Sequence, residues 1–243
     1  MPTKPKPKAA ARGRPPAKQG EDRRALLLDV ALTLFARQGI AATSLHSIAR
    51  EASVTPALLH YYFGNREQLV DALLAERIAP VVAQLSGTLA ALHDEPLRAI
   101  YALAERMLAA LDDIPWLPSL WVREVLCEGG LLRAYLLEHI APDMARKVRQ
   151  LALNAQRAGL LNAALDPRLL IVSLIGLTLF PLSAASIWRQ LPGYKSITTE
   201  TLARHMLEVL AHGIQTPGIE MPDRAKSGID KPLGENRHAK RAS

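Results

Sequence analysis

The fold of this chain is decided by residues 43–69, which read TSLHSIAREASVTPALLHYYFGNREQL. Thr43 or Ser44 can cap a short helix, whose apolar inner face recurs at helical spacing. A tight turn must follow. Thr55 is then a good N-cap, and Pro56 suits the first position of a second short helix, because an amide proton at that position would have no helical partner. The sequence therefore predicts two short helices joined by a turn of about four residues.

Longer helices flank this pair. Between Glu21 and about Gln38 the apolar residues recur at spacings of three and four, and Gly39 ends that helix. On the other side Asn65 and Gln68 have the spacing of a capping box, which opens a long helix that should reach about Leu92. A longer helix that closes the apolar faces of two short ones forms a helix-turn-helix, in which the second short helix reads DNA. Length and capping alone also allow a plain three-helix bundle.

Residues 23–74 carry a more specific pattern, in which apolar positions, the turn, an aromatic cluster and a basic residue at the next helix start occur in register. The positions are Ala31, Phe35, Gly39, Thr43, Ile48, Ala49, Ala52, Val54, Tyr61, Tyr62, Phe63, Arg66, Glu67 and Leu69. This pattern resembles the DNA-binding region of the TetR family of bacterial transcriptional regulators. The resemblance implies an all-α protein with an N-terminal three-helix helix-turn-helix domain and a C-terminal helical bundle for ligand binding and dimerisation. It also implies a ligand-responsive regulator, usually a repressor, which a small-molecule effector releases from a palindromic operator in double-stranded DNA.

The resemblance assigns roles to individual residues. Those expected to touch phosphate are Thr43, His60 and Arg66. Those expected to face the major groove are Thr55, Pro56, Ala57, Leu58 and Tyr61. This second set is mostly apolar, so it can meet thymine methyl groups but offers few paired hydrogen bonds to bases. The choice of sequence then rests on His46, Tyr61 and DNA shape, although His46 is also consistent with an ordinary solvent-exposed residue of the first short helix.

Three positions depart from the family pattern. Ser53 stands where the family usually has Gly, so we expect a left-handed backbone there at some cost. His60 replaces a phosphate-contacting Tyr, and because histidine changes its charge between about pH 5 and 8, DNA binding should tighten mildly on acidification. Arg66 replaces a Lys, keeps the charge and can bind a phosphate through two donors.

The positive charge lies mainly at the two ends of the chain. Of the formal +7, residues 1–19 hold six basic and no acidic residues and residues 223–243 hold six basic and three acidic, which leaves 18 basic and 20 acidic residues between them. We therefore expect a disordered basic arm at 1–19 and a disordered basic tail at 216–243. Between them we expect a DNA-binding domain at 20–66 and an effector-binding and dimerisation domain at 67–215.

The basic arm contains a second motif that points to DNA. The run Arg12-Gly13-Arg14-Pro15 resembles the core of an AT-hook, in which Arg12 and Arg14 would enter a narrow minor groove. A basic, proline-rich arm is also consistent with a role in solubility alone. If the arm supplies attraction to DNA, its removal should weaken binding and flatten the dependence of affinity on salt.

Beyond about residue 92 the pattern remains helical, with helices expected at 95–112, 117–128, 130–158 (bent near Pro142), 166–189 and 197–214. Residues 169–188 carry no charge over 20 positions, which is the length of a membrane span. Their polar and small residues, and their place among amphipathic helices, favour a buried helix instead. By the resemblance, the last two long helices form a homodimer interface, where Gly176, Ala184 and Ala185 allow close approach.

An effector pocket is expected among the C-terminal aromatic residues, with one charged group to orient the ligand. The candidates are Trp116, Trp121, Glu124, Cys127, Tyr135 and Phe180. Each aromatic residue is also consistent with an ordinary core position. Cys127 is the single cysteine, so it cannot form an internal disulfide.

No motif in the sequence supports catalysis. A Walker A loop and the patterns G-x-G-x-x-G, G-x-S-x-G and H-E-x-x-H are absent, and the seven histidines are scattered. We therefore expect no enzyme, metal or cofactor. The start of the chain has no apolar signal segment, so we expect a cytoplasmic protein without a membrane partner. The competing functions are an architectural protein that binds AT-rich DNA and a helical membrane-associated or ligand-carrier protein.

Overall fold

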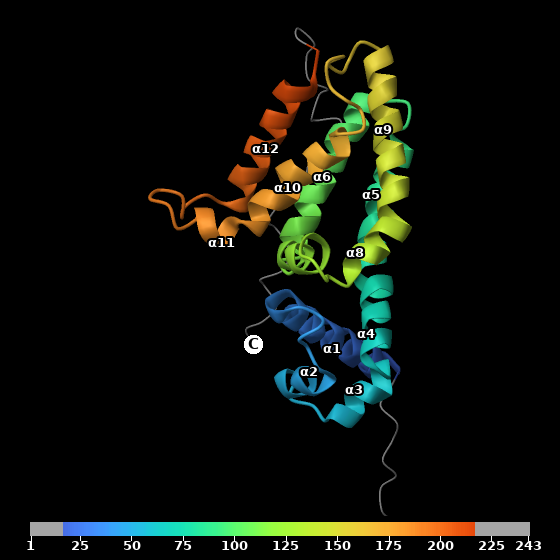
Figure 1. Cartoon of the computed structure of the whole chain (residues 1–243), viewed down its shortest axis with the longest axis vertical. Coiled ribbons are helices and arrows are strands. Elements are labelled where there is room, and N and C mark those ends of the chain that lie inside the picture. The colour runs from blue at the N-terminus through green and yellow to red at the C-terminus, as the bar shows by residue number, and fades with distance from the viewer. Residues whose placement is uncertain (1–16, 217–243) are drawn as a thin grey trace, which may run out of the picture.

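The computed structural model describes residues 17–216, and in this range the backbone is helical and contains no β-strand. Figure 1 shows a small group of helices at one end, connected by a long helical segment to a larger bundle. This arrangement confirms the prediction of an all-α protein with an N-terminal helix-turn-helix. The arm predicted at 1–19 extends too far, because the first helix begins at Ala17. Arg12, Arg14 and nearly all of the predicted tail lie outside the described residues.

The small group consists of α1 (Ala17–Gln38), α2 (Leu45–Glu51) and α3 (Pro56–Phe63). Ser44 is the N-cap of α2, since its Oγ accepts a hydrogen bond from the Ser47 amide at 3.1 Å. After α2 the chain turns through Ser53, whose φ of 55° confirms the expected left-handed backbone. The Val54 amide then donates to the Ala49 carbonyl at 2.9 Å, which closes the turn before α3.

Two predicted caps have different outcomes. Thr55 has the backbone conformation of an N-cap, but its side chain makes no capping hydrogen bond, so the predicted role of its hydroxyl is wrong. Pro56 at the first helical position lowers the need for that bond, because it removes one unpaired donor. The capping box is confirmed: the Gln68 amide donates to Asn65 Oδ1 at 2.9 Å, and the Asn65 amide donates to Gln68 Oε1 at 3.1 Å.

The long connecting segment joins both parts of the molecule. It is formed by α4 (Arg66–Leu73), the π-helical segment η1 (Leu74–Ile78) and α5 (Ala79–Ala91), and so ends close to the predicted position. Its first turns belong to the buried N-terminal core together with Leu59 and Phe63 of α3. This core also includes Leu120 and Leu132, so residues of the larger bundle pack directly on the helix-turn-helix.

The larger bundle is built around α6 (Pro96–Asp113), which contacts α5, α9, α10 and α12. The other elements are α7 (Leu117–Trp121), η2 (Val122–Leu126), α8 (Leu132–Tyr135), η3 (Leu136–Ile140), α9 (Ala141–Arg157), α10 (Leu170–Ser183), α11 (Ala185–Trp188) and α12 (Thr199–Ile214). The segments η2 and η3 are π-helical turns, like η1. Three such segments in one chain are unusual, and π-helical turns are frequent at functional sites.

The uncharged stretch at 169–188 is not one helix. It is divided between α10 and α11 at Ala184, and Pro181 inside α10 lacks the amide proton that would continue the helical hydrogen bonds. The single helix predicted at 166–189 is therefore wrong at its start and in its continuity. Among residues 17–216 no helix combines the length and the apolar character needed to cross a bilayer.

Candidate DNA-binding surface and effector pocket

Helix α3 presents two different faces. Leu59 and Phe63 are buried, at 0% and 4% exposure, and they fix the helix on the N-terminal core. Tyr61 is 77% exposed, and its ring makes an edge contact with Tyr62 at 5.3 Å between centroids. The Tyr61 side chain is therefore accessible on a helix whose other face is fixed in the core.

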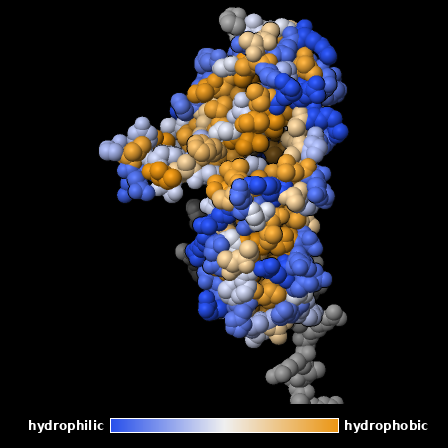
Figure 2. Space-filling view, viewed as in Figure 1, coloured by the Kyte–Doolittle hydropathy of each residue, from blue (hydrophilic) through white to orange (hydrophobic). Residues whose placement is uncertain are grey.

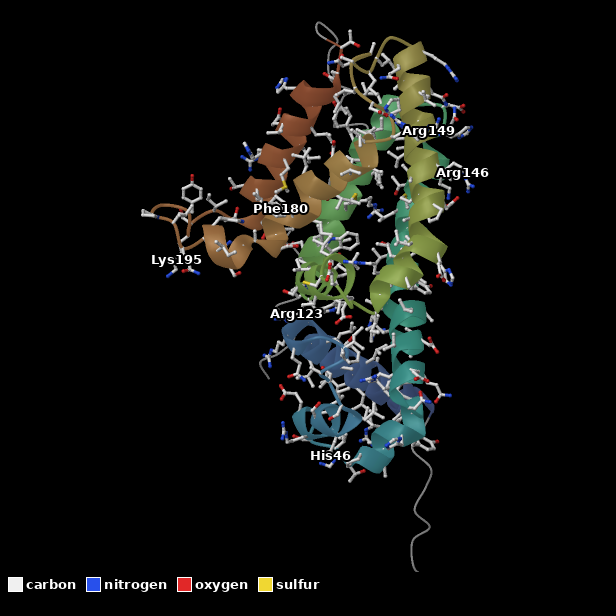
Figure 3. All side chains as sticks on the ribbon, in the orientation of Figure 1. His46, Arg123, Arg146, Arg149, Phe180 and Lys195 are labelled. Atoms are coloured by element: carbon white, nitrogen blue, oxygen red, sulfur yellow. The ribbon has the colours of Figure 1, made fainter. Side chains whose placement is uncertain are left out.

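Among the other described residues predicted to meet DNA, all but one are exposed or half-buried. Thr55, Ala57 and His60 are exposed, whereas Pro56 and Leu58 are half-buried. Figure 3 places His46, on α2, at the same end of the molecule as α3. The DNA contacts themselves stay predictions.

Thr43 is the exception, because its side chain is only 1% exposed. Its hydroxyl donates to the Gly39 carbonyl at 2.7 Å and accepts from Gln38 Nε2 at 3.1 Å. These bonds hold the turn between α1 and α2. We therefore exclude the Thr43 side chain from the phosphate-binding set, since it has no access to solvent.

His60 lies in the last turn of α3 and Arg66 is the first residue of α4, so the two residues flank the connection between these helices. Arg66 Nη1 donates to the Ala41 carbonyl at 3.2 Å, which places the exposed guanidinium beside the turn before α2. His60 Nδ1 lies 2.6 Å from the Gly64 carbonyl. A carbonyl oxygen only accepts, so Nδ1 carries the proton, and in the neutral ring the other nitrogen has none. Neutral His60 therefore cannot donate to a phosphate, whereas protonated His60 can.

A cavity of about 380 Å³ lies in the larger bundle, between the connecting segment, α6, α9 and α10. Its wall consists entirely of Leu, Ile, Val, Met, Ala, Trp and Tyr residues. Figure 2 shows a hollow surrounded by hydrophobic residues on this part of the surface. The π-helical segments contribute to the wall through Leu74 and Ile78, through Val125, and through Leu136 and Ile140.

The predicted pocket residues divide into two groups. Trp116, Trp121 and Tyr135 line the cavity. Glu124, Cys127 and Phe180 do not: Glu124 is buried against backbone amides outside the cavity, Cys127 is exposed, and Phe180 is 65% exposed on α10. Sequence reasoning missed the wall residues of α5, α6 and α9, because an apolar position beside a cavity has the same pattern as one in a filled core.

Helix α10 carries an exposed apolar face. The exposed residues are Leu169, just before α10, and Val172, Gly176 and Phe180 on α10, and Ile187 on α11 is also exposed; Val172 in addition lines the cavity. Phe180, labelled on α10 in Figure 3, is 65% exposed. Large apolar side chains grouped on one face of a soluble protein indicate a surface that a partner covers.

Comparison with known proteins agrees with this geometry. Residues 27–73 match the family model described as "Bacterial regulatory proteins, tetR family". The HTH-type transcriptional regulator BetI of Rhizobium meliloti (strain 1021) is 38% identical over 82 residues, which make up 34% of this chain and 35% of that protein. The HTH-type transcriptional repressor KstR2 of Rhodococcus jostii (strain RHA1) is 42% identical over 52 residues, or 21% of this chain and 26% of that protein. These matches thus span about a third or less of each curated relative.

Solved structures extend the likeness to the whole fold. The ketosteroid transcriptional regulator KstR2 of Mycobacterium tuberculosis superposes with a TM-score of 0.64 at 20% identity, covering 80% of this chain and 95% of that one. A putative fatty acid metabolism regulator of Clostridium perfringens gives a TM-score of 0.63 at 17% identity, covering 81% and 100%. Residues 27–73 therefore resemble the DNA-binding region of the TetR family of bacterial regulatory proteins, and the solved structures show that the chain shares the fold of these regulators.

Proposed function

We propose that this protein is a homodimeric transcriptional repressor, which leaves its palindromic operator when a neutral, mainly apolar small molecule enters the bundle cavity. The observation that carries the DNA-binding part is α3 itself, with Leu59 and Phe63 anchored in the core and Tyr61 held out into solvent. The relatives are regulators rather than enzymes. A cytoplasmic location belongs to this proposal, because bacterial DNA lies there.

The chemistry of the cavity supports the class of effector. Apart from the Tyr135 hydroxyl and the indole N–H groups of Trp116 and Trp121, no wall side chain offers a hydrogen bond of ordinary strength. A charged ligand would lose its hydration without gaining a partner, which is costly in an apolar site. The cavity volume of about 380 Å³ falls in the range of small-molecule sites. Fold neighbours include a ketosteroid transcriptional regulator, a putative fatty acid metabolism regulator and a complex of SmeT with triclosan, and these compounds are mainly apolar.

The connecting segment supports a route for release. Leu74 and Ile78 of η1 line the cavity, and the same continuous segment begins at Arg66 beside the reader helix α3. An occupant that favours a shifted position of this segment would change the placement of α3. Release follows if the spacing between the two α3 helices of a dimer no longer matches the operator.

The exposed face of α10 supports dimerisation. A palindromic site needs two reader helices about 34–36 Å apart, or a multiple of that distance, and therefore two copies of the chain. We expect Phe180→Glu to convert the dimer to a monomer, because it puts a charge in the middle of the covered face. Leu26→Glu on α1 is the matched control, since Leu26 is 59% exposed and Phe180 is 65% exposed. Light scattering that finds the same mass for wild type and Phe180→Glu would contradict this interface.

Two fluorescent probes of nearly equal shape test the effector class. N-phenyl-1-naphthylamine is neutral, and 8-anilinonaphthalene-1-sulfonate carries a sulfonate on the same ring system. We expect the neutral probe to bind at least about tenfold more tightly, because burial of an unpaired charge costs more than 1 kcal/mol. We also expect it to weaken binding to labelled DNA from the region that flanks the protein's own gene. Equal or tighter binding of the sulfonate would exclude an apolar effector in this cavity.

A further inference from the structure

Two neighbouring side chains of η2 bind the end of α1. Glu124 is buried, at 4% exposure. Its Oε1 accepts a hydrogen bond from the Ile40 amide at 2.7 Å, and its Oε2 accepts one from the Leu131 amide at 3.0 Å. Arg123 Nε donates to the Ala36 carbonyl at 3.0 Å. Figure 3 shows Arg123 at the junction between α1 and the larger bundle.

The Ile40 amide and the Ala36 carbonyl, which Glu124 and Arg123 bind, are the donor and acceptor of one missing helical hydrogen bond. In a continuous α-helix the amide of Ile40 would donate to the carbonyl of Ala36, four residues earlier. Helix α1 ends at Gln38, and Gly39 has a φ of +87°, so this bond cannot form. Arg123 and Glu124 replace it at both ends, which leaves neither backbone group unsatisfied. A buried carboxylate that accepts two amides makes strong, charge-assisted bonds, so this contact is rigid.

The same short segment also forms part of the cavity wall. Trp121 and Val125 line the cavity, and they stand on either side of Arg123 and Glu124 in the sequence. A molecule that presses on Trp121 and Val125 therefore acts on the turn that holds α1. From the end of α1 the path continues into α2, because the Thr43 hydroxyl donates to the Gly39 carbonyl at 2.7 Å.

We propose that Arg123 and Glu124 are positioning residues that couple the occupancy of the cavity to the placement of the helix-turn-helix. This inference rests on the proposed function, since it assumes that an apolar molecule enters the cavity. It adds a second route to the one through the connecting segment. When the cavity is filled, η2 moves and the bond between Glu124 and the Ile40 amide opens.

The test measures amide hydrogen exchange at Ile40 and probe affinity in the full chain. In wild type, saturation with N-phenyl-1-naphthylamine should speed exchange at Ile40 by about tenfold or more, the effect of losing one good hydrogen bond. Glu124→Gln has one acceptor oxygen for the two amides and no charge, so the bond to Ile40 is weakened; exchange at Ile40 should be faster than in free wild type and respond less to the probe. Glu128→Gln is the matched control, because Glu128 is exposed on the same stretch of chain.

Probe affinity distinguishes a coupling role from a merely structural one, because coupling between two events acts equally in both directions. If filling the cavity opens this contact at a cost, a variant without the contact avoids that cost. Glu124→Gln should therefore bind the probe more tightly than wild type, by up to about tenfold, while Glu128→Gln binds it as wild type does. If Glu124→Gln does not fold, Arg123→Gln carries the same prediction with a smaller effect, since Arg123 is exposed.

The outcomes separate this inference from the function on which it rests. A probe that binds wild type without any change at Ile40, or that binds Glu124→Gln no more tightly than wild type, overturns the coupling role. A probe that does not bind at all contradicts the apolar-effector proposal instead. The coupling role of Arg123 and Glu124 is then tested without a ligand. Ala110 lines the cavity, so the larger side chain of Ala110→Trp should occupy it; Ala145→Leu replaces this variant if it does not fold. Faster exchange at Ile40 supports the coupling, and unchanged exchange overturns it.

Discussion

Replacement of Tyr61 by Ala should separate DNA binding from stability. Tyr61 is 77% exposed and its ring contacts one neighbour edge-on, so its loss should lower the free energy of unfolding by at most about 1 kcal/mol. If the side chain enters the major groove, the same loss should weaken DNA binding by about 1–3 kcal/mol, which is roughly 5- to 150-fold in affinity. The two effects are measured by urea unfolding and by fluorescence anisotropy of labelled operator DNA.

A neighbour on the same helix should show the opposite behaviour. Leu59 is 0% exposed, so Leu59→Ala should cost about 2–5 kcal/mol of stability and lose DNA binding only through unfolding. Tyr194→Ala is a matched control, because Tyr194 is an exposed tyrosine far from α3 in the sequence. A folded Tyr61→Ala protein that binds operator DNA like wild type would refute the assignment of α3 as the reader helix.

Three further changes test other parts of the account. Ser53→Gly removes a side chain from a φ of 55° and should raise the free energy of unfolding by up to about 1 kcal/mol in urea; a decrease would contradict the strain. Burial raises the pKa of Tyr101 to about 12, so its contribution to stability should be constant below about pH 10 and lost as the pH rises toward 12. Tyr101→Phe should therefore show less loss of stability than wild type between pH 9.5 and 11.5, and parallel curves would contradict this. Deletion of residues 1–14 removes five basic residues and should flatten the slope of log affinity against log salt by up to about four; an unchanged slope would exclude the arm from DNA.

Local chemistry explains why the helix-turn-helix could be predicted from the sequence. The capping box of Asn65 and Gln68 involves residues three apart, and the left-handed turn at Ser53 depends on the chain immediately around it. The apolar spacing of α3 also identifies Leu59 and Phe63 as its inner face. All of these features depend on short-range contacts, which spacing and residue type describe well.

The errors have both local and long-range causes. Thr43 resembled a phosphate ligand, but its hydroxyl donates to the Gly39 carbonyl four residues earlier and is buried. Glu124 resembled a charge that orients a ligand, but it binds the amide of Ile40, 84 positions away in the sequence. Phe180 resembled a pocket residue and lies on the outer face of α10. For Glu124 and Phe180 the residue type alone does not show which surroundings the side chain has, because these depend on how helices distant in the sequence pack.

The most direct test of the central claim is a footprint on the DNA that flanks the protein's own gene. Two exposed α3 helices in a dimer predict one protected, pseudo-palindromic site with half-sites about 34–36 Å apart or a multiple of that distance. Protection should disappear with Tyr61→Ala and with Phe180→Glu at protein concentrations that saturate wild type. Uniform protection along AT-rich DNA, or a defined site that Tyr61→Ala still protects, would contradict the claim.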